Sequence, residues 1–568
     1  MSLPRVLERA ARPTLLLAQP GLADRAALPE GVRLESLGDP VAGADEERWG
    51  CVVVAARDRA ALRAGLEAPP AVGRTRALVT WLAEATTPLV PRVRPEWPDP
   101  VELDAHLTDD GGAVTRLRLA GVAPTQELLA RLRVDAGSRG TAASGGLVVA
   151  RDDDPDAKVP ADVLRGGAPA DDPSPVTGRA AVVVRGAGPV AAEVTVDEGV
   201  LNPTGFRRDW ERLVVELSAD VLHGPVTEST VAALRDAQGV RVPGSATAYD
   251  VAALAMAGVP LLASTPPEGL APALAALLTA EVDLSDAVAR EVHSVHLRRA
   301  AAAGHSLLAE RTRLGAAAGV RVAGLPTVSV VLATRRRALL DFAVTQVAKQ
   351  RGADIELVLA PHGFDLDAEL RAALRSRLGE IPLVVVPSPR SARFGDVLHA
   401  AAQAASGEVV LKMDDDDWYG PDVATDLLWA RRTSGAELVG MPAELVYLDQ
   451  LGITVRRRAV VERSAQVVAG GTMLIGRDDL RAVGGFRSVV KYVDAQLLAG
   501  VRLAGGRVHR TQGLGYLLRR TATGHTWATE LGYFLSRRTV AAQWRGFRPS
   551  PLHEVGPDEW PARPAAVS

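Results

Sequence analysis

The sequence predicts an α/β protein built from several domains. Its 568 residues are enough for three or four domains at about 150 residues each. Short apolar runs alternate with amphipathic stretches, as expected of parallel strands that are joined by helices. Hydrophobic residues make up 47% of the chain and charged residues 23%, which is a globular balance.

Composition also excludes several classes of protein. The formal net charge is -3, so the chain has no overall basic field for nucleic acid. Cys51 is the only cysteine, which excludes an internal disulfide and a cysteine-based metal site and predicts a cytoplasmic protein. No signal peptide is visible, and the longest apolar run, about 251–264, is too short to cross a bilayer. Peripheral attachment to the inner face of a membrane stays compatible with these features.

The N-terminal region, 1–135, is predicted to be a Rossmann-like α/β domain. Apolar runs at 14–18, 51–55 and 77–81 have the uniform character of buried parallel strands. The following residues, 136–178, are rich in Gly, Ser, Asp and Pro, and they predict a linker or an insertion.

The next region, 179–315, is also predicted to be α/β, with strands at 180–184 and 259–262 and long helices at 284–314. The segment 249–262 loosely resembles the nucleotide-side helix and strand of GT-B glycosyltransferases.

The GT-B pattern carries an acid five residues before its glycine, which is Gly258 here, but this chain has Ala253 at that position. The resemblance therefore implies a structural or acceptor-recruiting module.

The region 325–530 carries the most informative pattern, because its strands and helices alternate. Strands are predicted at 328–333, 355–359, 383–386 and 409–413, with helices at 339–350, 366–378 and 397–405. This order predicts a parallel, doubly wound sheet. Four aspartates, 414–417, directly follow the last strand, at the edge where open α/β sheets bind ligands.

The four adjacent carboxylates repel one another and need a cation to compensate. In an extended backbone, Asp414 and Asp416 would face one side, and Asp415 and Asp417 the other. Oxygen ligands without Cys or His nearby suit Mg²⁺ or Mn²⁺, which would bridge a diphosphate and neutralise a leaving group. The alternative is a solvated acidic turn before a helix that starts near Pro421.

Residues 326–527 resemble the family 2 glycosyltransferases of the GT-A fold, which implies a Rossmann-like domain with a mixed sheet. The motifs that carry the resemblance are, in chain order, 328–334, 391–396, 412–419, 470–475, 483–486, 493–494 and 505–510. They correspond to the first strand, the Ala-Arg-Asn element, the D-x-D element, the acceptor-side strand, the Gly-Gly-Phe turn, the Glu-Asp pair and the strand after the following helix.

The resemblance implies an inverting, metal-dependent transfer of sugar from a nucleotide-sugar donor to a glycan or lipid-linked acceptor, in cell-surface polysaccharide synthesis. It makes Asp494 the candidate general base. The candidate metal ligands for Mn²⁺ or Mg²⁺ are Asp414, Asp416 and His525. The candidate donor-binding residues are Thr334, Arg336, His362, Arg393, Asp414 and Asp415.

Three positions depart from the family pattern. His362 follows the second strand where the family has Asp-Asp-Gly-Ser, Phe394 replaces an Asn, and Val493 replaces a Glu. These departures motivate an alternative, a catalytically inactive binding or scaffold protein. A nucleotidyltransferase is disfavoured because the basic run 335–337 contains no glycine.

Other interpretations stay open for individual residues. His362 is either a donor-base contact or a solvated loop histidine, and Arg393 is a diphosphate contact or a surface ion pair. Asp494 also suits a helix N-cap. Trp418 and Tyr419 would form an acceptor wall or belong to the core. Residues 531–568 are predicted as a C-terminal extension, irregular after position 548.

Overall fold

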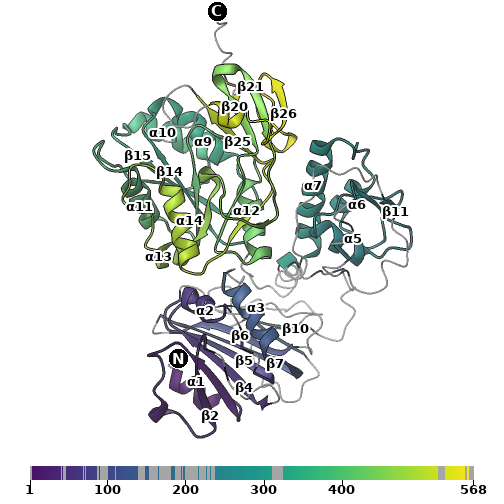
Figure 1. The fold of residues 1–568 in the computed structure, drawn as a ribbon, viewed down its shortest axis with the longest axis vertical. Coiled ribbons are helices and arrows are strands. Elements are labelled where there is room, and N and C mark those ends of the chain that lie inside the picture. The colour runs from purple at the N-terminus through teal and green to yellow at the C-terminus, as the bar shows by residue number, and fades with distance from the viewer. Residues whose placement is uncertain are drawn as a thin grey trace, which may run out of the picture.

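The computed structural model shows a mixed α/β protein with several sheets (Figure 1). It describes residues 3–137, short segments between 147 and 234, and residues 237–561, with gaps in the first and last parts. The gaps are 40, 42–46, 68, 71, 86–88, 90–99, 109–110, 307, 310–311, 313–323, 522–530 and 557–558. In the described part of the chain, no helix is long and apolar enough to span a membrane.

The N-terminal domain is built on a seven-stranded sheet with the order β2-β1-β4-β5-β7-β6, and β3 pairs with β5. The strands are β1 (Thr14–Ala18), β2 (Val32–Ser36), β3 (Arg48–Trp49), β4 (Cys51–Ala56), β5 (Arg74–Leu82), β6 (Pro100–Leu107) and β7 (Ala113–Pro124). The first five strands pair in parallel, which confirms the predicted strands, while β7 and β6 add an antiparallel edge. Helices α1 (Leu3–Arg9), α2 (Arg59–Gly65) and α3 (Thr125–Gly137) accompany this sheet.

A small parallel sheet follows, with the order β8-β10-β9. Its strands are β8 (Leu147–Arg151), β9 (Leu164–Arg165) and β10 (Ala181–Arg185). The last of these is the strand predicted at 180–184. The interval 136–178, predicted as a linker or an insertion, contains two short strands.

The middle region combines a second small parallel sheet with three helices. Its strands are β11 (Val215–Glu216), β12 (Val240–Arg241) and β13 (Leu261–Leu262), and its helices are α5 (Ala248–Met256), α6 (Pro272–Leu278) and α7 (Ala287–His305). The Asp286 carboxylate caps α7 by accepting from the backbone N–H groups of Val288 and Ala289. Helix α7 confirms the helical prediction over residues 287–305, and much of the remainder of the predicted range 284–314 lies outside the described residues.

The C-terminal domain holds an eight-stranded mixed sheet with the order β16-β15-β14-β17-β23-β19-β24-β22. The strands are β14 (Val328–Thr334), β15 (Ile355–Pro361), β16 (Leu383–Val385), β17 (Val409–Met413), β19 (Leu438–Gly440), β22 (Arg463–Ser464), β23 (Leu474–Gly476) and β24 (Val508–Arg510). The first four in spatial order are parallel, as the sequence predicts. Because β23 is antiparallel to β17, the sheet as a whole is mixed, as the resemblance implies.

Helices cover this sheet on both faces, and apolar residues of alternate strand positions enter two separate cores. The helices are α9 (Leu340–Ala348), α10 (Ala368–Leu378), α11 (Phe394–Ala404), α12 (Val423–Ser434), α13 (Arg477–Ala482) and α14 (Val493–Leu503). Three of them, α9, α10 and α11, confirm predicted helices with boundaries shifted by a few residues.

A second, five-stranded sheet of the C-terminal domain has the order β18-β25-β20-β21-β26. Its strands are β18 (Trp418–Tyr419), β20 (Leu445–Leu448), β21 (Ile453–Arg457), β25 (Tyr516–Arg520) and β26 (Val540–Arg545). The last strand belongs to the predicted extension 531–568, which also contains the short helix α15 (Leu531–Phe534). After position 548 the extension forms a 3-10 turn at Pro551–His553, in which Leu552 and His553 are buried, so this part of the extension packs on the domain.

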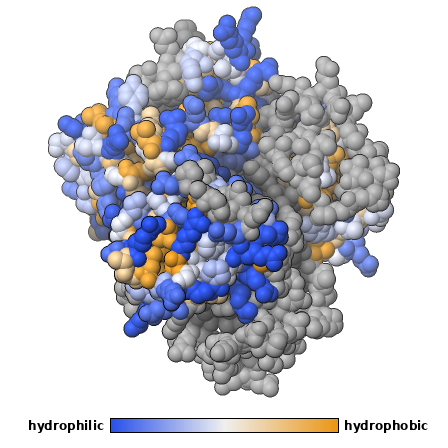
Figure 2. Space-filling model, turned by 60° about the horizontal axis from the view of Figure 1, so that its bottom comes forward, coloured by the Kyte–Doolittle hydropathy of each residue, from blue (hydrophilic) through white to orange (hydrophobic). Residues whose placement is uncertain are grey.

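Among the residues that are coloured in Figure 2, hydrophilic ones predominate, and the hydrophobic ones lie in small separate groups.

Candidate functional site

The four aspartates lie at the carboxyl edge of the eight-stranded sheet. Strand β17 ends at Met413, and the neighbouring parallel strand β14 ends at Thr334. The chain therefore leaves both strands on the same edge, and the residues that follow them meet. This is the location that the strand pattern predicts for a ligand site.

The expected alternation of the four carboxylates is wrong, because the chain bends at 415–417 instead of staying extended. Asp414 contacts Lys412, while Asp415 and Asp416 both contact Arg336. Asp417 is directed to another sheet, where its carboxylate accepts from the Tyr516 hydroxyl at 2.6 Å. The bend thus divides the cluster among three different partners.

Arg336 and Thr334 organise the middle of the cluster. The Thr334 hydroxyl donates to Asp415, as do Nε (3.1 Å) and Nη2 of Arg336. Arg336 Nη1 donates to Asp416 Oδ2 at 2.8 Å. Burial raises the pKa of both carboxyl groups, and the guanidinium opposes that shift. Three predicted donor-binding residues, Thr334, Arg336 and Asp415, are therefore in direct contact with one another.

Lys412 links the cluster to Asp494. Its ammonium is 2% exposed and lies 2.7 Å from Asp414 Oδ1 and 3.4 Å from Asp494 Oδ1. Burial favours the neutral amine, yet the two carboxylates raise the pKa of Lys412 above its usual value. Sequence reasoning gave this lysine no role, although a single charge in the apolar strand 409–413 was an available signal.

Asp494 occupies the second position of α14, so its alternative role as the N-cap is wrong. The N-cap is Tyr492, an exposed residue with a positive φ of 64°. The Asp494 side chain is 38% exposed, but its Oδ1 atom is buried. This desolvation raises the pKa of the carboxyl group, a shift that the neighbouring Lys412 opposes and Asp414 reinforces.

Two consecutive glycines let the backbone approach these carboxylates. A Cβ on Gly470 would lie 2.0 Å from Asp494 Oδ2, and one on Gly471 would lie 2.9 Å from Asp414 Oδ2. The glycines open the turn Gly470–Thr472 before β23, at the start of the predicted acceptor-side motif. Only a residue without a side chain fits at either position.

The remaining predicted site residues make other contacts. His362 is buried rather than solvated, and Arg335 Nε donates to its Nδ1 at 3.0 Å. Burial lowers the pKa of His362, and the nearby charge of Arg335 lowers it further. Arg393 is exposed and donates to the Ser488 carbonyl at 3.2 Å. His525 lies outside the described residues.

The two aromatic residues after the cluster belong to the core and do not form an acceptor wall. Trp418 packs against Phe342, Tyr447 and Phe547, and both Trp418 and Tyr419 are fully buried. The Tyr419 hydroxyl accepts from the Asp414 backbone N–H at 2.8 Å. The buried Tyr419 side chain therefore fixes the backbone at the start of the acidic segment.

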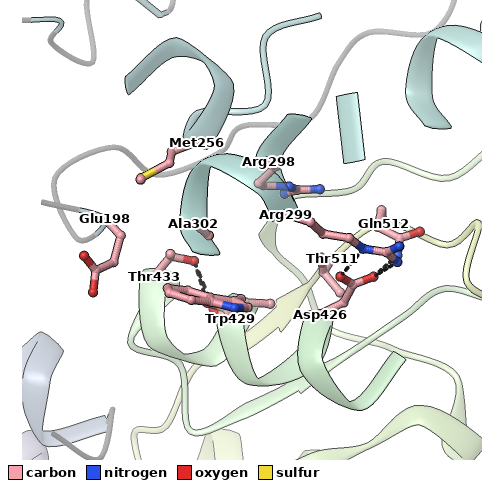
Figure 3. Close-up of a pocket in the computed structure, with 11 residues that line it drawn as sticks. Glu198, Met256, Arg298, Arg299, Ala302, Asp426, Trp429, Thr433, Thr511 and Gln512 are labelled. Atoms are coloured by element: carbon pink, nitrogen blue, oxygen red, sulfur yellow. Dashed lines mark hydrogen bonds and ion pairs between the residues drawn. The ribbon is translucent and has the colours of Figure 1, made fainter. Parts of the chain in front are cut away.

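A separate pocket that is open to solvent lies between α7 and α12 (Figure 3). The Trp429 ring and Met256 give it apolar walls, and Arg298, Arg299 and Asp426 are among its polar residues. It is distinct from the acidic cluster, and no sequence pattern indicated it.

The described residues contain no group of three His, Cys, Asp or Glu side chains arranged to hold a metal ion. Mg²⁺ is commonly bound by one or two carboxylates together with substrate phosphates, so a complete protein cage is not required. Every candidate donor among residues 414–417 is a carboxylate oxygen, which is the chemistry that Mg²⁺ and Mn²⁺ prefer. Asp414 and Asp416 thus offer the donor type that such an ion prefers, and Asp416 is paired with Arg336.

The fold of part of the chain is similar to solved glycosyltransferase structures. A structure of residues 1–349 of S. aureus TarS, in complex with UDP-GlcNAc, matches 36% of this chain and 62% of that fragment, with 14% identity and a TM-score of 0.30. The mannosyltransferase PcManGT from Pyrobaculum calidifontis, in complex with GDP-Man and Mn²⁺, matches 35% of this chain and 58% of its own, with 15% identity and a TM-score of 0.28. The match spans less than two thirds of either protein. No family model and no curated protein matches the sequence.

Proposed function

We propose that the C-terminal domain is an inverting glycosyltransferase that uses a nucleotide-sugar donor and a glycan or lipid-linked acceptor, in cell-surface polysaccharide synthesis. One observation carries the proposal. Thr334, Arg336 and the carboxylates of Asp414, Asp415 and Asp416 meet at the ends of two adjacent parallel strands. Asp494 lies beside them, across Lys412. The motifs in this order resemble those of the family 2 glycosyltransferases, which supports the same conclusion.

Asp414 and Asp416 would hold the divalent cation, which would neutralise negative charge on the departing diphosphate. The Asp414 side chain is 35% exposed, so one ligand is open to solvent. Asp416 is 8% exposed and is paired with Arg336. We expect Arg336 to exchange part of its contact with Asp416 for a bidentate contact with the diphosphate, which suits a guanidinium.

Asp494 is the proposed general base. Its raised pKa, caused mainly by burial, makes the carboxylate a better proton acceptor than an exposed aspartate. Lys412 keeps the carboxylate ionised and holds it in position through the 3.4 Å contact. The proton of the acceptor hydroxyl would pass to Asp494 as that oxygen attacks the sugar.

An inactive scaffold with the same fold is the second candidate. The observation that favours it is the pairing of Asp415 and Asp416 with Arg336, which compensates two carboxylates without a metal. His362 also has its ring nitrogens in contact with Arg335 and the Ala392 carbonyl, rather than facing an open base site.

Titration calorimetry and donor hydrolysis distinguish the two candidates. We expect the wild-type chain to bind UDP or GDP in the presence of Mn²⁺ and to hydrolyse a matching nucleotide-sugar slowly. Asp416→Asn should abolish both. The matched control is Asp341→Asn, which alters a 73% exposed carboxylate of the same domain that is paired with Arg377. A wild-type chain that is inert across a panel of donors and acceptors refutes the transferase and favours the scaffold.

A further inference from the structure

Helix α7 of the middle region reaches the C-terminal domain through Arg299. The guanidinium donates from Nε and Nη2 to both oxygens of Asp426, at 2.9 and 2.7 Å (Figure 3). It also donates from Nη1 to Asp422 at 2.7 Å. The three side chains are 19%, 9% and 14% exposed. A fork of this geometry fixes the orientation of the Asp426 carboxylate.

Asp426 in turn fixes Gln512. The Gln512 amide donates from Nε2 to Asp426 Oδ2 at 2.9 Å. Its Oε1 accepts from the backbone N–H groups of Leu514 and Gly515, at 2.7 and 3.1 Å. Both ends of the carboxamide are therefore used, one on α12 and the other on the turn that leads into β25.

That turn is continuous with the acidic cluster. Tyr516, the next residue, donates its hydroxyl to Asp417 at 2.6 Å, and the Arg519 backbone N–H donates to the same carboxylate at 2.8 Å. The Gly515 carbonyl accepts from the Gly420 backbone N–H at 2.8 Å, just beyond the cluster. The C-terminal end of the four-aspartate segment, at Asp417, and the residue Gly420 thus depend on the position of the turn and of the start of β25.

We propose that Arg299 is a positioning residue for the acidic cluster, acting through Asp426, Gln512 and Tyr516 on Asp417. Without the guanidinium, the Asp426 carboxylate would lose the fork that orients it toward Gln512. The turn before β25 would then lose its side-chain link to α12, while Thr511 and the Gln512 backbone N–H would keep their contacts with Glu462. This proposal goes beyond the transferase activity, because it assigns the middle region a role in shaping a site to which it contributes no ligand.

The contacts that lead from Arg299 through Asp426, Gln512 and Tyr516 to Asp417 are called the relay below. Hydrogen exchange of the full chain, followed by mass spectrometry, tests the relay without relying on any activity. We expect Arg299→Ala and Gln512→Met to accelerate exchange in peptides covering 414–420 and 512–520 by about tenfold or more, since local protection depends on these hydrogen bonds. Arg299→Lys should give an intermediate effect, because an ammonium keeps the charge but loses the fork.

The matched control is Glu291→Gln on the same helix. Glu291 contacts Arg456 of the C-terminal domain at 2.7 Å, and Arg456 keeps its second partner, Glu444, at 2.8 Å. This variant should leave exchange at 414–420 and 512–520 within about twofold of wild type. Wild-type protection of these peptides in folded Arg299→Ala would overturn the proposal, as would equal acceleration in Glu291→Gln. If Arg299→Ala does not fold, Arg299→Lys and Gln512→Met decide the question in the same way.

A second measurement links the relay to ligand binding. Arg299→Ala should weaken UDP or GDP binding in Mn²⁺ by about fivefold or more, and Arg299→Lys should restore part of the affinity. Undiminished affinity in Arg299→Ala would overturn the relay. A wild-type chain that binds neither nucleotide refutes the proposed function, and hydrogen exchange then decides the relay alone.

Discussion

Replacement of Lys412 by methionine tests how the acidic site is held together. The ammonium is 2% exposed and contacts two carboxylates, Asp414 and Asp494, which are 35% and 38% exposed. Methionine preserves most of the side-chain volume, so that packing changes little while the charge is lost.

Two effects determine how much Lys412→Met should lower the free energy of unfolding. Removal of one partner from a fully buried ion pair costs about 3–5 kcal/mol, because the other charge stays buried without compensation. Here both carboxylates are more than one third exposed, so water can replace much of the lost contact. We therefore expect Lys412→Met to lower the free energy of unfolding of the C-terminal domain by about 1–3 kcal/mol.

A double-mutant cycle with Asp494→Asn provides the assay, with urea unfolding followed by circular dichroism. If Lys412 pairs with Asp494, the double variant should be more stable than the sum of the single effects predicts, by about 0.5 kcal/mol or more. Lys349→Met is the matched control, since Lys349 pairs with Glu559 at 2.8 Å, outside the site. Additive effects of Lys412→Met and Asp494→Asn would refute the reasoning.

Three further predictions concern other parts of the chain. Gly471→Ala should lower the free energy of unfolding in urea by about 1–3 kcal/mol and weaken nucleotide binding, because its Cβ would meet the Tyr419 hydroxyl at 2.6 Å. The control Gly532→Ala should be neutral, because the space around Gly532 is open. Equal costs for the two variants would contradict the steric argument. Burial, assisted by Lys349, lowers the pKa of His553 to about 3, so the stability that this neutral histidine contributes is complete above pH 6.5 and is lost as the pH falls toward 3. At about pH 5 the loss should be about 2 kcal/mol and should be absent in His553→Gln, and parallel pH profiles would refute it. Burial raises the pKa of the Cys51 thiol to about 12, so Ellman's reagent should label the chain only after unfolding, and rapid labelling of the native chain would contradict this.

The strands of the large sheets could be predicted because burial on both faces imposes a local signal. The runs 14–18 and 409–413 are apolar in almost every position, and both are fully buried. The acidic cluster could be located for the same reason, since it follows such a run directly. Its internal geometry could not, because a bend rather than an extended backbone separates the carboxylates.

The second sheet and the links between domains were beyond sequence reasoning. Strand β26 pairs with β21 across a long sequence separation, and its alternating exposure gives only a weak signal. Arg299 and Asp426 are 127 residues apart, and nothing local to either residue indicates the other. Lys412 and Asp494 were both visible in the sequence, but their contact depends on the approach of α14 to β17, which only the tertiary fold sets.

The position of α7 affects how the protein should be divided for expression. On one side the helix is bound to its own region, where His293 contacts the Leu261 carbonyl and Ser294 donates to that of Gly258. On the other side, Arg298 and Arg299 neutralise acids of the C-terminal domain. A recombinant fragment that starts at residue 325 would leave Asp422, Asp426 and Glu462 without these arginines, so the sensible cut for crystallographic work precedes α7.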